Sequence, residues 1–251
     1  MLKTIDLEKI IEIAKDAGRV IMEVYQKDFS IEYKDDSSPL TEADLKSNEL
    51  ICEALIRLYP HIPILSEENK MVSYEERKEW DYFWLIDPID GTKEFIKKNG
   101  EFTVNIALIK EGIPILGVVY APVLEDIYSA KKGEGAFKNG EKLPLLFNNS
   151  PKEKLKVVAS KSHLSNETQE FIDNLDTKTI EQVSKGSSLK LCMVAEGVAD
   201  IYPRLAPTME WDTGAAHAVV LEAGKMVSIF DNSQSLQYNK KNLLNPWFVV
   251  Q

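Results

Sequence analysis

The sequence predicts a mixed fold, with an α+β first part and an α/β second part. The chain opens with two segments of helical periodicity, continues with a run of apolar strands, and ends with strands and helices that alternate. Such alternation indicates helices layered on a sheet. The irregular stretch Asn148-Asn149-Ser150-Pro151 separates the two patterns. We therefore expect one compact unit with two subdomains, residues 1–150 and 151–251.

The first part is expected to begin with an amphipathic helix at residues 6–26, where apolar residues recur at helical spacing. Ser37-Ser38-Pro39 is predicted as a loop. Thr41 then opens a second helix, whose expected apolar face comprises Leu45, Cys52, Leu55 and Tyr59. The polar stretch 70–79 is predicted as an exposed helix or lid.

Strands are expected where apolar residues run or alternate between turn signals. In the first part they fall at 62–65, 82–87, 102–109, 115–120, 126–130 and 136–138, with a short segment at 92–98. In the second part strands are expected at 156–160, 179–183, 199–202 and 226–230. Helices are expected between them at 166–175, 188–196 and 212–223.

Charge and hydropathy exclude two classes of protein. The formal net charge of −10 opposes binding to a nucleic acid polymer, and no basic run reverses it locally. No stretch is apolar enough to cross a membrane, and the N-terminus does not resemble a signal peptide. We expect a cytoplasmic protein whose partner is a small molecule. A peripheral position on the cytoplasmic face of the inner membrane is the alternative, and no basic lipid-binding patch supports it. The sequence leaves the oligomeric state open.

The most informative segment is Trp84-Leu85-Ile86-Asp87-Pro88-Ile89-Asp90-Gly91-Thr92, an apolar strand that ends in clustered polar residues. Two carboxylates so close together repel each other unless a cation lies between them. Mg²⁺ is the expected cation, because hard divalent ions prefer oxygen ligands.

Further acids occupy the ends of predicted elements, where loops converge on one crevice in layered α/β folds. The set comprises Asp44, Glu67, Asp87, Asp90 and Asp212. With two or three Mg²⁺ ions, such a set forms a site for metal-assisted phosphoryl transfer or hydrolysis. One ion lowers the pKa of a water and another stabilises the leaving oxygen.

Each acid also has a structural alternative. Asp44 lies three residues after Thr41, as in a capping box, and this role is compatible with catalysis. Glu67 and its neighbour Glu68 could be solvated loop acids, and Asp212 could be a helix N-cap. Asp87-Pro88 and Asp90-Gly91 could be plain turn residues.

Three further segments could bind an anion. The backbone N–H groups of Gly91 and Thr92 would open a short helix that cradles phosphate, and the Thr92 hydroxyl could orient a water. The segment Lys185-Gly186-Ser187-Ser188-Leu189-Lys190 offers hydroxyl donors and two cations, although a Ser-capped helix with solvated lysines explains it equally well. His163, in a predicted loop, could contact a base or phosphate, or simply be solvated.

Two of these segments match signatures of a known family. Asp87-Pro88-Ile89-Asp90-Gly91-Thr92 with Phe95, followed at a distance by Trp211-Asp212-Thr213-Gly214-Ala215-Ala216, resembles the paired signatures of the inositol monophosphatase superfamily. Within it, Gly186-Ser187-Ser188-Leu189-Lys190 and Tyr202-Pro203-Arg204 are most similar to the bacterial 3'(2'),5'-bisphosphate nucleotidases. The resemblance covers nearly the whole chain.

The resemblance implies a layered αβαβα sugar-phosphatase fold and Mg²⁺-dependent hydrolysis inhibited by Li⁺. It implies metal ligation by Glu67, Asp87, the backbone carbonyl of Ile89, Asp90 and Asp212. Asp44, Glu67 and Thr92 would position or activate the water. Substrate contacts would come from Gly91, Thr92, His163, Ser187, Ser188, Lys190 and Arg204. Lys161 stands where relatives usually carry Arg, and a lysine cannot make a bidentate contact with phosphate.

The expected reaction is hydrolysis of adenosine 3',5'-bisphosphate to AMP and phosphate, with its sulfated analogue PAPS as a second substrate. Inositol monophosphatase and fructose-1,6-bisphosphatase activities are the alternatives. A non-catalytic ligand-binding regulator is disfavoured, because such a protein would not need every metal ligand.

Overall fold

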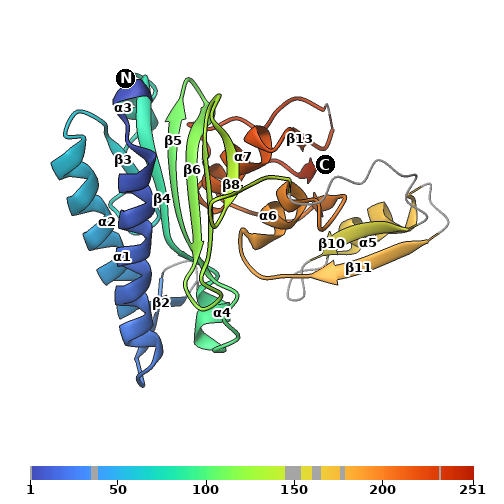
Figure 1. The fold of residues 1–251 in the computed structure, drawn as a ribbon, viewed down its shortest axis with the longest axis horizontal. Coiled ribbons are helices and arrows are strands. Elements are labelled where there is room, and N and C mark those ends of the chain that lie inside the picture. The colour runs from blue at the N-terminus through green and yellow to red at the C-terminus, as the bar shows by residue number, and fades with distance from the viewer. Residues whose placement is uncertain (1, 35–38, 145–153, 160–164, 176–178, 232) are drawn as a thin grey trace.

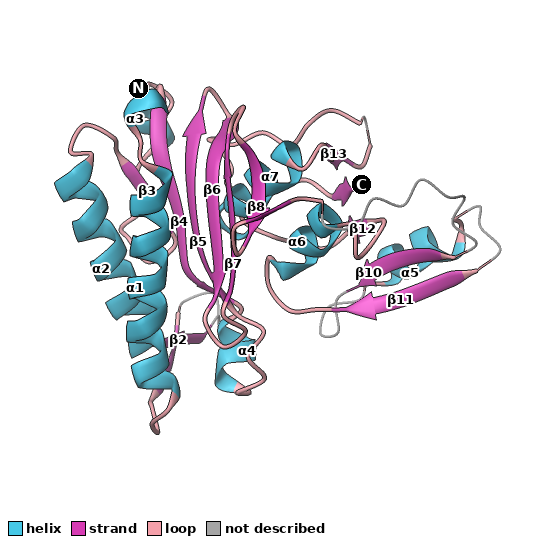
Figure 2. Ribbon diagram, in the orientation of Figure 1, coloured by secondary structure: helices cyan, strands magenta, loops and turns pink. Residues whose placement is uncertain are grey.

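The computed structural model describes residues 2–34, 39–144, 154–159, 165–175, 179–231 and 233–251. These residues form alternating layers of helices and strands (Figures 1 and 2). The helices α1 (Leu7–Tyr25) and α2 (Glu42–Leu58) cover one face of a large sheet, and α6 (Leu189–Glu196) and α7 (Trp211–Glu222) lie on its other side. A smaller set of strands and α5 (Asn166–Asp173) follow beyond α6. This arrangement confirms the predicted mixed, layered fold.

The large sheet has seven strands in the order β3-β4-β5-β6-β7-β8-β9. Only β3 and β4 run parallel; the later neighbours pair antiparallel. The strands are β3 (Ile64–Ser66), β4 (Tyr82–Asp90), β5 (Thr103–Lys110), β6 (Ile113–Ala121), β7 (Asp126–Lys131), β8 (Gly135–Lys138) and β9 (Glu141–Lys142). All but the two-residue β9 were predicted from apolar patterning, although β4 extends three residues past the predicted end, through both aspartates.

Side-chain alternation along β4 explains why this strand carries no polar residue before Asp87. Phe83 and Leu85 pack in the core shared with α6 and α7, whereas Trp84 and Ile86 pack in the core shared with α1 and α2. A strand buried on both faces must be apolar at every position. The first carboxylates therefore appear only where the strand leaves the two cores.

The helix α7 approaches the sheet closely at Gly117 of β6. A Cβ atom at Gly117 would lie against the carbonyl oxygen of Ala215 and 2.8 Å from the Cβ of Ala218. Helix and strand can meet at this distance only because residue 117 has no side chain. This contact fixes the position of α7 and hence of Asp212 near its first turn.

The smaller strands of the second part form two sheets joined by a bridge between Val157 and Ile201. The strands β10 (Leu155–Ala159) and β11 (Ile180–Ser184) pair parallel. The strand β14 (Phe248–Val250) lies between β12 (Tyr202–Arg204) and β13 (Val227–Ile229), antiparallel to both. The sequence patterns did not predict β14, because three residues are too few to show alternation.

Several local predictions were wrong. Leu55 is buried as predicted, but Leu45 is 49% exposed, because α2 packs through Ala43, Ser47 and Ile51 beside Leu55. Pro39 lies in β2 (Pro39–Thr41), which pairs with β1 (Ile31–Tyr33). Ala199 and Ile201 precede β12 rather than belong to it. The stretch 70–79, predicted as an exposed helix or lid, does contain a helix, α3 (Tyr74–Arg77), but it is only four residues long and its Arg77 is buried.

The remaining elements are the 3-10 turn η1 (Leu2–Thr4) and the short helix α4 (Thr92–Ile96). The proposed subdomain boundary at 148–151 lies outside the described residues, so the division stays a prediction. Among the helices that the structure describes, none is long and apolar enough to cross a membrane.

Candidate active site

Three carboxylates from distant parts of the chain meet at the end of β4. Glu67 follows β3, Asp87 lies in β4, and Asp212 lies in the first turn of α7. Each offers an oxygen within 4.8 Å of the others. The parallel pairing of β3 with β4 brings Glu67 beside Asp87, and the packing of α7 on the sheet brings Asp212 to them. We call these three residues the carboxylate cluster.

Two members of the carboxylate cluster, Asp87 and Asp212, form no ion pair with a lysine or arginine among the described residues. Asp87 is 1% exposed, and burial and the nearby acids raise its pKa well above the ordinary value. Burial, then Asp90, raises the pKa of Asp212 to about 8. Buried carboxylates that repel one another fit a divalent cation, which would remove both the repulsion and the cost of desolvation.

Asp90 closes β4 and shares the same pocket as the carboxylate cluster. Burial raises its pKa to about 6, although the Lys190 ammonium and the Ser188 backbone oppose that shift. The amide of Asn105 lies 3.5 Å from its carboxylate. Because β4 continues through Asp87-Pro88-Ile89-Asp90, the alternative of ordinary turn residues is wrong for Asp87, Pro88 and Asp90, whereas Gly91 does lie in a turn, directly before α4.

Lys34 provides the cation nearest to Glu67. Its ammonium lies 2.8 Å from Glu67 and 2.6 Å from Glu68. Burial opposes the charge on Lys34, but the two carboxylates raise its pKa overall. Burial also raises the pKa of Glu68 to about 7, and its side chain is only 6% exposed. The alternative that Glu68 is a solvated loop acid is therefore wrong. Sequence reasoning missed Lys34, since no local motif marks it.

Asp44 and Thr92 form a second pair at the site. The predicted capping box is confirmed, because the backbone N–H and hydroxyl of Thr41 both donate to Asp44 Oδ2, at 2.8 and 2.7 Å. This leaves Asp44 Oδ1 to accept from the Thr92 hydroxyl at 3.3 Å. The carbonyl of Ile89 lies at the same distance from that hydroxyl. The structural and functional roles of Asp44 thus use different oxygens.

Asp212 is not the N-cap that sequence reasoning allowed. Helix α7 begins at Trp211, so Asp212 is its second residue. Its Oδ2 accepts instead from the backbone N–H of Met209, at 2.8 Å. Gly91 caps α4 with a φ of +93°, a left-handed conformation that favours glycine.

The segment 185–190 also lines the pocket. Ser188 is buried and its hydroxyl donates to Asn105 Oδ1 at 3.0 Å, with Thr103 2.9 Å away. The Ser187 hydroxyl lies 3.4 Å from that of Thr103. Thr103 and Asn105 were not singled out from the sequence. Their signal was available, because both are polar residues in an otherwise apolar strand.

Lys190 and Arg204, two cations that line the pocket, have different surroundings. Lys190 is 8% exposed, and burial lowers its pKa to about 8 while Asp90 acts in the opposite direction. The alternative of a solvated lysine is therefore wrong for Lys190. The Arg204 Nη2 donates to the Pro207 carbonyl at 2.8 Å, and its buried Nε has no hydrogen-bond partner among the described residues. A buried N–H without a partner is available to an anion.

A pocket of about 300 Å³ joins these groups. Of the predicted site residues, it is lined by Glu67, Asp87, Ile89, Asp90, Gly91, Thr92, Ser187, Ser188, Lys190, Arg204 and Asp212. Asp44 lies behind Thr92 and reaches the pocket through it. His163 and Lys161 lie outside the described residues, so their predicted roles stay predictions.

Comparison with known proteins agrees with the fold. A model of the inositol monophosphatase family matches residues 6–247, and the chain belongs to this family. It is 45% identical to the 3'(2'),5'-bisphosphate nucleotidase CysQ of Salmonella typhimurium over 97% of this chain and 98% of that protein. The corresponding protein of Escherichia coli K12 is 44% identical, with the same coverage.

Solved structures agree with these sequence relatives. The crystal structure of CysQ from Bacteroides thetaiotaomicron superposes with a TM-score of 0.85 and 42% identity, over 98% of this chain and 96% of that one. An inositol monophosphatase of Thermotoga maritima superposes with a TM-score of 0.78 and 26% identity, over 96% and 89% of the two chains.

Proposed function

We propose that this protein is a Mg²⁺-dependent 3'(2'),5'-bisphosphate nucleotidase that converts adenosine 3',5'-bisphosphate to AMP and phosphate. The observation that carries the proposal is a pocket lined both by the carboxylate cluster and by two cations, Lys190 and Arg204. A substrate with two phosphates could place one at the metal ions held by the carboxylates and the other at these cations. The high identity to CysQ nucleotidases supports the same substrate class.

Glu67, Asp87, Asp90, Asp212 and the carbonyl of Ile89 would hold two or three Mg²⁺ ions. When bound, these ions supply Lewis-acid stabilisation of the charge on the transferred phosphoryl group. Carboxylate and carbonyl oxygens suit Mg²⁺, and the raised pKa values of Asp87 and Asp212 are what such a cluster is expected to have when no cation balances its charge.

Asp44 and Thr92 are proposed to orient the attacking water. Because the Thr92 hydroxyl donates to Asp44 Oδ1, its oxygen lone pairs remain free to accept a hydrogen bond from water, and Asp44 can take up the water proton through this hydroxyl. The water oxygen then bonds to phosphorus, the bond from phosphorus to the 3' oxygen breaks, and that oxygen takes a proton from solvent water. Attack on the 3' phosphate of PAPS would give adenosine 5'-phosphosulfate by the same step.

The remaining pocket residues would bind the substrate. The backbone N–H groups of Gly91 and Thr92 and the hydroxyls of Ser187 and Ser188 would contact the transferred phosphate. Lys190 and Arg204 are proposed to bind the second phosphate. A charge-assisted hydrogen bond of this kind contributes roughly 1.5–3 kcal/mol, which corresponds to about 10- to 100-fold in kcat/KM.

The direct test is phosphate release from four substrates, with Mg²⁺ or with a chelator. The panel comprises adenosine 3',5'-bisphosphate, its 2',5' isomer, inositol 1-phosphate and fructose 1,6-bisphosphate. We expect the nucleotides to be preferred and the chelator to abolish turnover. Preference for inositol 1-phosphate or fructose 1,6-bisphosphate would contradict the substrate assignment, and no turnover of any substrate would contradict the enzymatic one. An Asp90→Asn variant is the inactive control.

Substitution of Lys190 or Arg204 tests which of the two phosphates these cations bind. Lys190→Ala and Arg204→Ala should lower kcat/KM for the bisphosphate nucleotide about 10- to 100-fold, and much less for inositol 1-phosphate. The ratio of the two losses is informative, because a general folding defect affects both substrates. Lys185→Ala is the matched control: Lys185 lines the same pocket but lies 3.4 Å from Glu101. Equal losses for both substrates would assign Lys190 and Arg204 to the transferred phosphate or to folding.

A further inference from the structure

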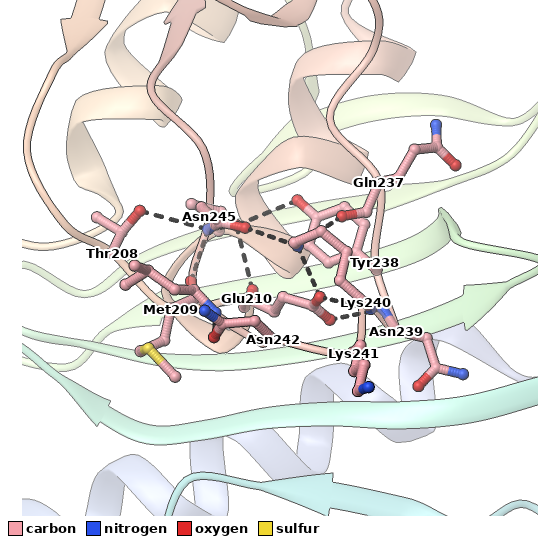
Figure 3. A network of polar contacts seen from close by, with 12 residues as sticks. Thr208, Met209, Glu210, Gln237, Tyr238, Asn239, Lys240, Lys241, Asn242 and Asn245 are labelled. Carbon is pink, nitrogen blue, oxygen red and sulfur yellow. Dashed lines mark hydrogen bonds and ion pairs between the residues drawn. The ribbon is translucent and has the colours of Figure 1, made fainter. Parts of the chain in front are cut away.

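A polar network in the last part of the chain has no role in the chemistry described so far (Figure 3). Residues 237–245, which we call the C-terminal clamp, form neither helix nor extended strand, yet contain many buried polar contacts. They surround Glu210, a carboxylate with no exposed surface. A buried charge is costly unless it is fully paired, so its partners must be well ordered.

Glu210 is satisfied entirely by the C-terminal clamp. Its Oε2 accepts from the backbone N–H of Asn239 at 2.7 Å. Its Oε1 accepts from the backbone N–H of Lys240 at 2.9 Å and from the Lys240 ammonium at 2.6 Å. Although Glu210 is only two residues before Asp212, both of its oxygens are occupied by groups of the clamp. Its charge therefore holds Lys240 rather than joining the carboxylate cluster.

Lys240 in turn determines how Asn245 is oriented. The ammonium also lies 3.2 Å from Asn245 Oδ1. An ammonium can only donate, so the amide oxygen of Asn245 must face it and the amide NH₂ must point the other way. That NH₂ donates to the carbonyl of Met209 at 2.8 Å and to the Thr213 hydroxyl at 3.1 Å.

The contacts of Asn245 end at the metal-site carboxylate. The backbone N–H of Asn245 donates to the carbonyl of Thr208 at 2.8 Å. That carbonyl belongs to the same peptide group as the Met209 N–H, which donates to Asp212 Oδ2 at 2.8 Å. The backbone N–H of Asn245 thus holds the Thr208–Met209 peptide group, whose N–H binds Asp212. The side chain of Asn245 holds the carbonyl of Met209, which belongs to the next peptide group.

We propose that Asn245 is a positioning residue for Asp212, held in its orientation by the Glu210–Lys240 ion pair. The network fixes the rotation of the Asp212 carboxylate, so that one oxygen stays on the Met209 N–H while the group faces Glu67 and Asp87. The inference rests on the proposed function, in which Asp212 is a metal ligand. Residues that orient a ligand in this way typically change metal affinity 10- to 100-fold when substituted.

The test measures Mn²⁺ binding to the substrate-free protein by electron paramagnetic resonance or calorimetry. Asn245→Asp keeps the size of the side chain but removes the NH₂ that donates to Met209. We expect it to weaken Mn²⁺ binding about 10-fold or more. Lys240→Met should cause a smaller loss, because the amide remains but loses the donor that orients it. At saturating Mg²⁺, KM for the nucleotide should stay close to that of the unsubstituted protein.

Asn139→Ala is the matched control. Asn139 lies in the turn between β8 and β9, outside the pocket, and its side chain accepts from the Ile127 N–H at 2.8 Å and donates to Asp126 at 3.1 Å. We expect this variant to lose stability with unchanged Mn²⁺ affinity. If Asn245→Asp does not fold, Asn245→Ser is measured instead, and failure of both to fold would assign Asn245 to folding and overturn the inference.

Two outcomes separate this inference from the proposed function. If the unsubstituted protein binds Mn²⁺ and folded Asn245 variants bind it equally well, the positioning role is wrong while the proposed function stands. If the unsubstituted protein binds no divalent cation, the proposed function fails, and the positioning role fails with it.

Discussion

Replacing Asp87 by asparagine should stabilise the metal-free protein while removing its response to Mg²⁺. Asp87 is almost fully buried within the carboxylate cluster. Asparagine keeps the oxygen that accepts from the Ile89 N–H at 3.1 Å, so the local geometry is retained. It removes a charge that repels Glu67 and Asp212. The variant therefore isolates the electrostatic cost of the empty site.

The magnitude follows from the size of the cluster. Two full charges 4.8 Å apart repel each other by about 3.5 kcal/mol at an effective dielectric constant of about 20. Protonation already relieves part of this repulsion, since the pKa of Asp212 is raised to about 8. We expect the free energy of unfolding to rise by about 1–3 kcal/mol in the variant, with roughly 2–4 °C of melting temperature for each kcal/mol.

The assay is thermal unfolding near the pKa of Asp212, with a chelator and again with Mg²⁺. Without metal, Asp87→Asn should melt above the unsubstituted protein. With Mg²⁺, the order should reverse, because binding to the folded state stabilises only a protein that retains the site. Asp126→Asn is the matched control: this acid is paired with Lys138 at 3.0 Å, so its loss should destabilise with or without metal. A metal-free Asp87→Asn protein that melts below the unsubstituted one would refute the reasoning.

Two further predictions concern pH and packing. The pKa of Asp212 is raised from 3.8 to about 8 in the folded protein, so between these values the folded state binds more protons than the unfolded one. The stability contributed by this group is therefore lost as the pH rises toward 8. The increase in melting temperature caused by Mg²⁺ should grow over the same pH range. Melting curves that show neither trend would contradict the assignment of a proton-binding cluster. Gly117→Ala should lower the free energy of unfolding by at least about 2 kcal/mol, because the new methyl group meets backbone of α7 that cannot move aside. Chemical denaturation measures this loss. Gly133→Ala is the control: it adds a methyl group where nothing lies within 4 Å, although the left-handed backbone there adds some strain of its own. Equal losses of stability in the two variants would show that the close approach of α7 to Gly117 is not the cause.

Local pattern determined much of the fold. The periodicity of residues 6–26 predicted α1, and the apolar runs predicted every strand of the large sheet except β9. These signals are readable because an element that buries one or both faces must repeat apolar residues at its own period. The same logic located Asp87 and Asp90, since the apolar run ends where β4 leaves the core. For these elements the sequence was sufficient.

Contacts between distant segments could not be inferred in this way. Lys34 pairs with Glu67 and Glu68, and Asn105 contacts Ser188, across separations that leave no periodic trace. Leu45 was placed on the wrong face of α2, because the direction of burial is set by the sheet against which the helix packs. Side-chain type alone did not reveal that direction.

The sequence by itself therefore determined which residues could carry the chemistry, and the tertiary structure decided how they are held. Asp212 was recognisable from its place at a helix start, but the C-terminal clamp that holds its neighbours was not. Glu210, Lys240 and Asn245 look like ordinary surface residues in the sequence, and only folding buries the Glu210 carboxylate among donors of the clamp. The reason is physical: local patterns record which face of an element is buried, whereas a polar network depends on three-dimensional distances that folding alone creates.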